Sequence, residues 1–571
     1  MSREVDSNAI RAVLVAVLAL SFTLIVGKFN GALSGLLVDT DSYTRLSRIV
    51  ASLEAGGVLA HIPRDNSGHA IALHWSHLLD AVILLLALPL WPLLGQPKAL
   101  HLAGAALGPI SAVAAVLATL WAARVLGARV QAAFAAGILA AMSPAITGYG
   151  AFGRADHHVL LGAIAVTCPL LAGMDRRFRF ASAALWGGVT AGLGLWLSPE
   201  ILPFVLLAWA FAVLRDVDDG GRIANRTRDF CAALLVTVVL ALLIDPPPSG
   251  RWAAEIDRLS RPFVELAALM MAVALLGRYL PRLAAGSWPA AIAAGALATL
   301  AVGAWALIYP AILRGAEGVF SAEAWLRIWR TNNEMRSPLE TAHDTAVFLV
   351  VPLTIVVAAA AVLLWRRPRP ADVLAVIGMA FVAYMACRHV RLSVYLQLAA
   401  AVAAALLLDR MASRLPALHQ RLAIIVATFA LAVAPYIGAL AFPAPPKTGA
   451  GQCDARAAAA DLTNFAGKVV LSPVNDAPAL LYFSRIITVA GPYHRAEQRI
   501  LNVMDAYGER DFRAGMPDSF RKTEAVAVLV CATQAHDPGT LAEALANGAP
   551  PSWLKEVPIR PASGFRLYAV Q

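Results

Sequence analysis

Three short polar clusters contain the residues of this sequence whose types and spacing suit metal-assisted chemistry. The first is Asp39-Thr40-Asp41, two carboxylates separated by one residue, and it follows the first long apolar segment. The second, Arg154-Ala155-Asp156-His157-His158, borders another apolar segment, and the third places Glu334 in the polar run 332–336. A carboxylate beside a membrane segment is costly to keep near lipid, and paired carboxylates are natural half-sites for a divalent cation. Ordinary solvated loops are the alternative for each cluster.

The composition indicates a protein with many membrane-spanning segments. Of 571 residues, 59% are hydrophobic and only 15% are charged, and the mean hydropathy is +0.66. No soluble core requires that much apolar sequence. The net charge of +10 comes mostly from arginines in short clusters between apolar segments. It therefore indicates membrane topology rather than nucleic-acid binding.

Thirteen apolar segments are predicted to be membrane helices. The first, 9–26, has the length that a bilayer requires and no small-residue cleavage site after it, so we expect a retained helix rather than a signal peptide. The segment 80–95 is apolar but has only 16 residues and contains Pro89 and Pro92, so we expect a re-entrant or interfacial element. The other twelve predicted spans are approximately 101–123, 130–148, 157–175, 180–197, 201–214, 230–244, 262–280, 285–310, 346–364, 371–387, 392–408 and 422–442.

The distribution of arginines predicts the orientation of these spans. With the amino terminus in the cytoplasm, every predicted inner loop is basic. The same count places the three clusters, Glu200 and everything after about residue 443 on the outer face. If the segment 80–95 crossed the membrane instead, Asp41 and Asp156 would lie on opposite faces. The three clusters form one site only in the first arrangement.

The composition changes after residue 442, where Pro443, Pro445 and Pro446 form a linker. The rest of the chain alternates short apolar runs with helical patterns, which predicts a small α/β domain outside the membrane. The expected strands are 468–471, 486–490 and 525–531, and the expected helices are 455–465, 494–507 and 541–547. Cys453 and Cys531 both belong to this domain. An oxidising compartment would allow them to form a disulfide, and two unpaired thiols are the alternative.

The predicted fold is therefore a polytopic α-helical membrane protein with about 13 spans and a C-terminal α/β domain outside the membrane. Residues 1–442 form the membrane domain, with a first outer loop at 28–100 and a later outer loop at 311–345. Residues 443–571 form the outer domain.

In this architecture, and in the order of its three clusters, the chain resembles the GT-C superfamily of membrane glycosyltransferases, in particular the catalytic subunit of oligosaccharyltransferase. The resemblance implies catalytic roles for Asp41, Asp156 and Glu334. It also implies a divalent cation, Mg²⁺ or Mn²⁺, held by these residues together with His158, with Asp39 as the alternative ligand from the first loop. One departure is the absence of the Trp-Trp-Asp-Tyr-Gly motif with which that family grips its acceptor.

Two arginines and several neighbouring polar residues are candidates for substrate contacts. Arg391 lies at the outer end of a predicted span and resembles the arginine with which the family contacts the lipid phosphate. Arg388 is a second candidate, and membrane anchoring by snorkelling is the alternative for both. Glu200 is either a residue that supports the metal ligands or an acid favoured by a helix N-terminus. The remaining candidates for orienting the ligands or contacting the acceptor are Arg154, His157, Tyr493, His494 and Arg495.

These residues predict a metal-dependent glycosyltransferase that moves a sugar or oligosaccharide from a polyprenyl-phosphate or polyprenyl-diphosphate donor to an acceptor on the outer membrane face. The departing phosphate is an anion, which a divalent cation and a fixed arginine both stabilise. One alternative is a transporter or flippase for the same lipid-linked glycan, whose carboxylates would lie near mid-membrane. Another is a polymerase or ligase of surface polysaccharide, which would not be expected to need a metal.

The expected location is the bacterial inner membrane, with the active site and the C-terminal domain in the periplasm. The expected partners are a polyprenyl-linked sugar donor, membrane lipid, and an acceptor that is a protein, a lipid or a glycan. No nucleic-acid partner is expected, because the basic residues follow the membrane topology.

Overall fold

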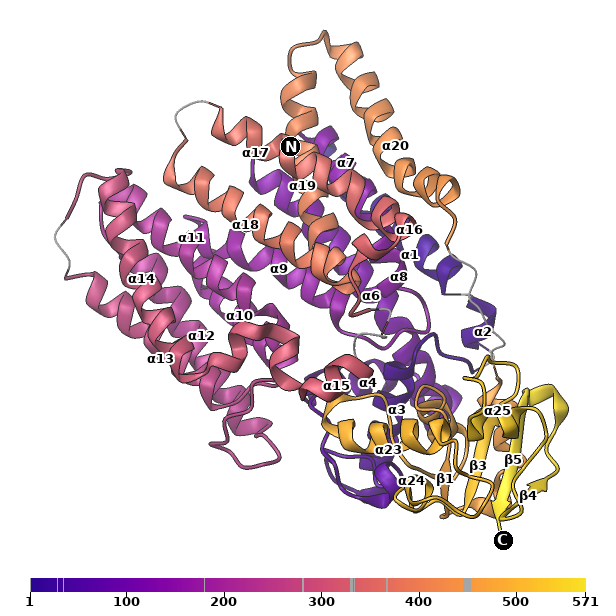
Figure 1. The fold of residues 1–571 in the computed structure, drawn as a ribbon. Coiled ribbons are helices and arrows are strands. Elements are labelled where there is room, and N and C mark those ends of the chain that lie inside the picture. The colour runs from indigo at the N-terminus through magenta and orange to yellow at the C-terminus, as the bar shows by residue number, and fades with distance from the viewer. Residues whose placement is uncertain are drawn as a thin grey trace.

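The computed structural model describes residues 2–27, 29–33, 35–178, 180–279, 282–328, 332, 334–365, 368–444 and 453–571. Long helices form a bundle, and a domain with a five-stranded sheet packs against one end of it (Figure 1). Asn333 of the third cluster, and Pro445 and Pro446 of the predicted linker, lie outside the described residues.

Eight helices of the described residues are long and apolar enough to cross a membrane, so the expected polytopic α-helical membrane protein is confirmed. They are α1 (Ser2–Val26), α6 (Gln96–Val125), α12 (Asn225–Ile244), α14 (Trp288–Ile308), α17 (Val351–Leu364, with the turns that precede it from Ala342), α18 (Pro370–Arg388), α19 (Ser393–Ala412) and α20 (Ala417–Ala441). The other predicted spans contain shorter or more polar helices, which are α7 (Val130–Ala141), α8 (Pro144–Tyr149), α9 (His158–Gly173), α10 (Ala183–Leu197), α11 (Leu202–Gly220) and α13 (Arg261–Gly277).

One predicted span is broken by a proline. The segment expected to be continuous from 130 to 148 divides into α7 and α8, because Pro144 lacks an N–H and disfavours helical backbone at Ser143. Gln397 of α19 satisfies the polar groups at the break. Its Oε1 accepts a hydrogen bond from the Ala145 N–H at 2.9 Å and another from the Ser143 hydroxyl. Irregular backbone among apolar helices requires such partners.

The short apolar segment 80–95 forms two separate helices, α4 (Leu78–Ala87) and α5 (Trp91–Leu94), before α6 begins. At about 1.5 Å per residue, α4 extends roughly half of the ~30 Å hydrocarbon core. Its buried Asp80 pairs with Arg45 at 3.1 Å and with Arg48 at 2.7 Å, and both arginines belong to α3 (Thr40–Ala55). The segment therefore supports α3 and is too short for a separate crossing.

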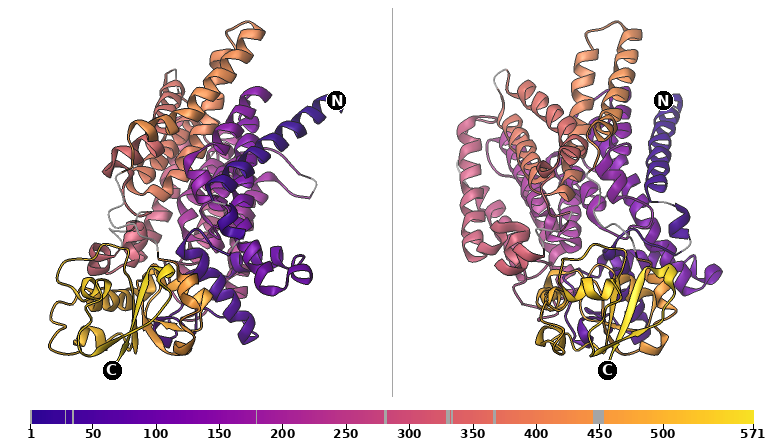
Figure 2. Two further views of the ribbon diagram at one scale, coloured as in Figure 1. Left: turned by 90° about the vertical axis from the view of Figure 1, so that its right-hand side faces the viewer. Right: turned by 45° about the vertical axis from the view of Figure 1, so that its right-hand side comes forward.

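The two ends of the bundle carry different elements. The amino-terminal end of α1 and the connection between α19 and α20 lie at one end, and the sheet domain lies at the other (Figure 1, Figure 2). Helices α3 and α4 lie beside the sheet domain (Figure 1). This arrangement agrees with the alternation of loops between the two membrane faces that the arginines predict.

The C-terminal domain contains a mixed sheet in the order β2-β1-β3-β5-β4. Strands β1 (Val469–Leu471), β2 (Ile487–Thr488) and β3 (Ala527–Cys531) are parallel and correspond to the three expected strands. Strands β4 (Leu554–Val557) and β5 (Phe565–Val570) add antiparallel pairings that the sequence analysis missed. The polar pair Lys555-Glu556 interrupts β4, which explains why no apolar run marks it.

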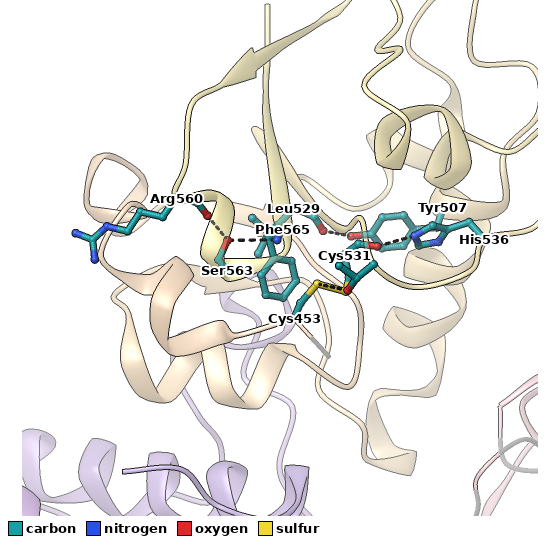
Figure 3. The surroundings of a disulfide bond; sticks show 9 residues. Cys453, Tyr507, Leu529, Cys531, His536, Arg560, Ser563 and Phe565 are labelled. Atoms are coloured by element: carbon teal, nitrogen blue, oxygen red, sulfur yellow. Dashed lines mark hydrogen bonds between the residues drawn. A yellow bond between two sulfur atoms is a disulfide. The ribbon is translucent and has the colours of Figure 1, made fainter. Parts of the chain in front are cut away.

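Cys453 and Cys531 form a disulfide, which confirms the pairing that the sequence left open (Figure 3). It joins the segment before α21 (Ala455–Ala459) to the end of β3, across 78 residues of sequence.

The first outer loop holds the C-terminal domain in place. Arg64 donates a hydrogen bond to the Ser484 carbonyl at 2.7 Å. The buried carboxylate of Asp65 accepts hydrogen bonds from the Thr488 hydroxyl at 2.8 Å and from the Tyr493 hydroxyl at 3.0 Å. Helix α22 (Ala477–Phe483) packs along α3, the helix that begins at the first polar cluster.

Removing the disulfide should destabilise the C-terminal domain. Closing a loop of this length contributes on the order of 4 kcal/mol by restricting the unfolded chain. The double variant Cys453→Ser/Cys531→Ser should therefore unfold at a lower temperature than the wild type, and dithiothreitol should lower the wild-type midpoint but leave the variant unchanged. Differential scanning fluorimetry of the purified full chain measures both. Equal midpoints for all samples would contradict a stabilising bond.

Candidate active site

The first and second clusters are joined through their backbones. Asp39 is the N-cap of α3 and accepts a hydrogen bond from the Ser42 N–H at 2.8 Å. The Val38 N–H donates to the Gly153 carbonyl at 3.0 Å, and the Ala155 N–H donates to the Ser42 hydroxyl oxygen at 2.8 Å. The loop before α3 and the loop before α9 therefore lie side by side, although more than 100 residues separate them in the sequence.

Two glycines allow the second loop to approach its neighbours. Gly153 has φ +97°, a left-handed conformation that favours glycine. Gly108 of α6 faces the same loop, and a Cβ at this position would lie 2.6 Å from the Ala151 carbonyl oxygen. The Phe152 N–H donates to the Thr23 carbonyl of α1 at 3.0 Å. The second cluster is thus held between α1 and α6.

Arg154 connects the three clusters. Its Nε lies 2.5 Å from Asp39 Oδ2, and its Nη2 lies 2.6 Å from Glu334 Oε1. The guanidinium also lies over the ring of Tyr149, 4.6 Å from the centroid. The side chain of Arg154 is only 13% exposed, so these ion pairs are poorly screened by solvent. Asp39 is accordingly committed to a helix cap and an ion pair.

The residues Asp156, His157 and His158 are buried and close together. Among the described residues they form the only group of three potential ligands whose donor atoms all lie within 4.8 Å of one another. Asp156 Oδ1 lies 2.8 Å from His157 Nδ1, and Asp156 Oδ2 lies 3.4 Å from His158 Nε2. The Nδ1 atoms of both histidines are buried and make no hydrogen bond within the described part of the chain. Such a donor set suits a divalent cation.

Asp41 is the carboxylate of the first cluster that remains available. Within the described ranges, its side chain makes no hydrogen bond or ion pair, in contrast to Asp39. Burial raises the pKa of the Asp41 carboxyl well above its ordinary value, and the negative charges of Asp39, Asp156 and Glu334 raise it further. A bound cation would reverse this effect. The group of Asp156, His157 and His158 therefore fits a divalent metal, and Asp41 is the carboxylate of the first cluster that could join it.

Glu200 lies between the histidine and the arginine expected to contact the donor. Its Oε1 accepts a hydrogen bond from the Tyr395 hydroxyl at 2.6 Å and lies 3.6 Å from His158 Nδ1. Its Oε2 lies 3.8 Å from Arg391 Nη2. Burial alone would raise the pKa of Glu200, but the positive charges of His158 and Arg391 outweigh burial and lower it below its ordinary value. This geometry favours the supporting role for Glu200, because its carboxylate lies beside the ring nitrogen of His158 that faces away from Asp156.

The two candidate arginines have different surroundings. Arg388 pairs with Glu317 at 2.6 Å and is about half exposed. Arg391 faces Glu200, and its buried Nε makes no hydrogen bond to the described residues. The Arg391 N–H also donates to the Glu334 carbonyl at 3.3 Å, so the third cluster lies against the start of α19. Arg391, rather than Arg388, therefore lies beside Glu200 and Glu334.

The residues Tyr493, His494 and Arg495 contact other outer loops. Tyr493 donates to Asp65, as described above. His494 Nε2 pairs with Asp257 Oδ2 at 2.7 Å, and Arg495 binds the same carboxylate at 2.6 Å. These side chains therefore anchor the outer domain on the membrane domain.

Sequence reasoning missed Ser42 and Tyr395. Ser42 lies three residues after the N-cap Asp39, a position that favours a reciprocal cap, and this spacing was a usable signal. Tyr395 lies in the first turn of α19 and Arg391 in the 3₁₀ turn before it, and both contact Glu200. The role of Tyr395 is visible only in the structure, where its hydroxyl donates a hydrogen bond to Glu200 at the end of another helix.

The sequence matches no known family model and no curated relative. Comparison of structures shows that the chain shares its fold with solved oligosaccharyltransferases, which agrees with the fold that the resemblance implied. The Archaeoglobus fulgidus oligosaccharyltransferase in its apo form is similar over 92% of this chain and 69% of its own length, with a TM-score of 0.69 and 14% sequence identity.

Two further structures from the same organism show the same likeness. One is the archaeal oligosaccharyltransferase AglB in complex with an inhibitory peptide and a dolichol-phosphate, with a TM-score of 0.67 at 14% identity, covering 92% of this chain and 69% of that protein. The other is the oligosaccharyltransferase in complex with Zn and sulfate, with a TM-score of 0.63 at 15% identity, covering 91% and 68%.

The contrast between the two aspartates of the first cluster can be tested directly. Asp41→Asn should weaken Mn²⁺ binding by at least about tenfold, the lower end of what loss of a supporting residue costs a metal site. Asp39→Ala should retain Mn²⁺ binding but lower thermal stability by about 1 kcal/mol, because it removes a helix cap. Electron paramagnetic resonance of free Mn²⁺ measures the first, and thermal unfolding measures the second. The opposite pattern would make Asp39 the ligand.

Proposed function

We propose that this protein is a metal-dependent glycosyltransferase that moves a sugar or oligosaccharide from a polyprenyl-phosphate or polyprenyl-diphosphate donor to an acceptor at the outer membrane face. The observation that carries the proposal is the buried group of Asp156, His157 and His158, which Glu200 links to Arg391 at the end of the bundle where the sheet domain lies. Asp41 and Glu334 are proposed as further ligands, because the charges of Asp156 and Glu334 act on the Asp41 carboxyl. The AglB structure with dolichol-phosphate supports a lipid-linked donor, and the structure with Zn supports a metal.

The residues of the site have separate roles in this reaction. An acceptor hydroxyl or amide attacks the sugar carbon that carries the phosphate, the bond from that carbon to the phosphate oxygen breaks, and a carboxylate of the cluster receives the acceptor proton. A divalent cation supplies a Lewis acid for the developing negative charge. Arg391 supplies charge-assisted hydrogen bonds to the departing phosphate. Glu200 and Tyr395 orient His158, and Arg154 keeps Glu334 beside the first loop.

The position of the carboxylates argues against a transporter. Asp41 begins α3, Asp156 precedes α9, and Glu334 lies in the loop before α17. Carboxylates that couple transport are expected near the middle of the membrane in broken helices. A metal-independent polymerase or ligase remains the alternative, and loss of turnover with a chelator, restored by Mg²⁺ or Mn²⁺, separates it from the proposal.

The role of Arg391 predicts a difference between two basic side chains. Arg391→Lys keeps the charge and the membrane anchoring but loses the planar pair of donors, so turnover should fall by about tenfold or more. Arg391→Ala should fall further at the same protein abundance. The measurement is turnover of a purified polyprenyl-linked donor by the three forms at matched concentration.

Arg388→Lys is the matched control, because Arg388 pairs with exposed Glu317, and it should retain turnover. Equal rates for Arg391 and its lysine variant, together with an unstable alanine variant, would assign Arg391 to membrane anchoring.

The orientation is also proposed. We place the active site and residues 443–571 in the periplasm of a bacterial inner membrane, on the basis of the basic loops and the disulfide. Alkaline phosphatase fused after Gln571 should be active, whereas green fluorescent protein at the same position should be dark. Fluorescence with inactive phosphatase would reverse the orientation.

A further inference from the structure

A polar cavity of about 380 Å³ lies where three outer segments meet. One segment is the loop between α12 and α13, and another is the 3₁₀ segment Pro310–Val319. The third is the 3₁₀ turn His494–Ala496 together with the first residue of α23 (Glu497–Gly508). The volume falls within the range of about 300–1,000 Å³ that is usual for small-molecule sites. The lining side chains include Glu255, Ile256, Asp257, His494, Arg495 and Glu497.

Ion pairs hold the walls of this cavity. Arg495 donates through Nε to Asp257 at 2.7 Å and through Nη2 to Glu255 at 2.5 Å. His494 pairs with Asp257 and lies against His74, with a ring separation of 4.2 Å. These groups come from the first outer loop, the loop after α12 and the outer domain. A site built from such mutually fixed groups loses little conformational freedom when it binds a ligand.

The cavity presents one unused hydrogen-bond donor group and one unused acceptor. In the part of the chain that the structure describes, Arg495 Nη1 makes no hydrogen bond. Glu497 Oε1 likewise accepts none there, whereas Oε2 of the same carboxylate accepts one from the Ser321 N–H at 3.2 Å. Neighbouring sugar hydroxyls both donate and accept, so they match a cavity that is lined by an arginine and a carboxylate. Ile256 and Val319 offer apolar edges for the C–H face of a sugar ring.

Other ligand classes fit less well. Three carboxylates against one arginine disfavour a phosphate or another anion. Two of those carboxylates already pair with Arg495, which disfavours a metal. The charged lining disfavours a lipid tail. A neutral, hydroxyl-rich ligand satisfies the unused groups without leaving a buried charge.

We propose that this cavity is a carbohydrate subsite, which binds a sugar unit of the glycan other than the unit whose bond reacts. The proposal rests on the proposed glycosyl transfer. The 3₁₀ segment that lines the cavity belongs to the same loop as Glu334, so the cavity and the acidic cluster share an outer loop. The glycan is either the part of the donor beyond the reacting sugar or the acceptor.

Saturation-transfer NMR on the full chain in detergent tests the proposal without requiring turnover. One probe is the oligosaccharide pool released by mild acid from the polyprenyl-linked lipids of the source cells, and the other is the pool released from their envelope glycans. At least one pool should receive saturation from the wild type. Glu497→Gln should weaken binding by about tenfold, the order expected for one charge-assisted hydrogen bond. Ile256→Trp should abolish binding by filling the cavity.

Glu556→Gln is the control, because Glu556 is another carboxylate of the same domain that lies on β4 and does not line the cavity. It should bind like the wild type. Response to the lipid-derived pool alone assigns the subsite to the donor, and response to the envelope pool alone assigns it to the acceptor. Any of three results would overturn the proposal. These are no response from either pool, unchanged binding in both cavity variants, and binding of a lysine-rich peptide in place of sugars. Binding without turnover would instead contradict the glycosyltransferase function.

Discussion

The site depends on one guanidinium. Arg154 binds Asp39 and Glu334, which are 115 and 180 residues away in the sequence. Without this cation, the carboxylates that meet at the end of an apolar bundle would repel one another in surroundings that screen charge weakly. Arg154 reaches both partners because the backbone before α9 lies against α1 and α6, where two glycines leave room for it.

The ion pairs of Arg154 divide the acidic residues of the site into two sets. Asp39 and Glu334 share the arginine, so each has a cationic partner within the protein. The negative charge of Asp156 contributes to the raised pKa of the Asp41 carboxyl. His158 lies between Asp156 and Glu200, and Glu200 faces Arg391. A cation bound by Asp41 and Asp156 would balance the negative charge of these two carboxylates, and Arg391 would add a second positive charge beyond Glu200. The arrangement suits a reaction that generates an anion between a metal and an arginine.

The outer domain adds a second constraint. It contacts the first outer loop through Asp65 and the loop after α12 through Asp257. The later outer loop also reaches it, where Arg327 pairs with Asp505 at 2.6 Å. Three loops of the membrane domain are therefore held by one domain. This explains why Tyr493, His494 and Arg495, which looked like candidates for acceptor contact, are engaged in contacts between domains, and why a cavity forms among them.

The sequence by itself determined the class of fold. Segments of about 20 apolar residues must become helices in a membrane, because backbone groups have no other partners there. Residue types and apolar runs also identified the three polar clusters, three of the five strands and the two cysteines that pair. Short or alternating segments carried weaker signals, so β4, β5 and the break at Pro144 were missed.

Only the tertiary structure decided what the individual polar residues do. Asp39 and Asp41 are equivalent in the sequence, but one caps a helix and pairs with Arg154 while the other stays available. Arg388 and Arg391 are three residues apart at the same membrane face, yet one turns to Glu317 and the other to Glu200. These differences depend on partners far away in the sequence. Local spacing specifies which residues can reach the outer face, and packing of distant loops specifies which of them meet.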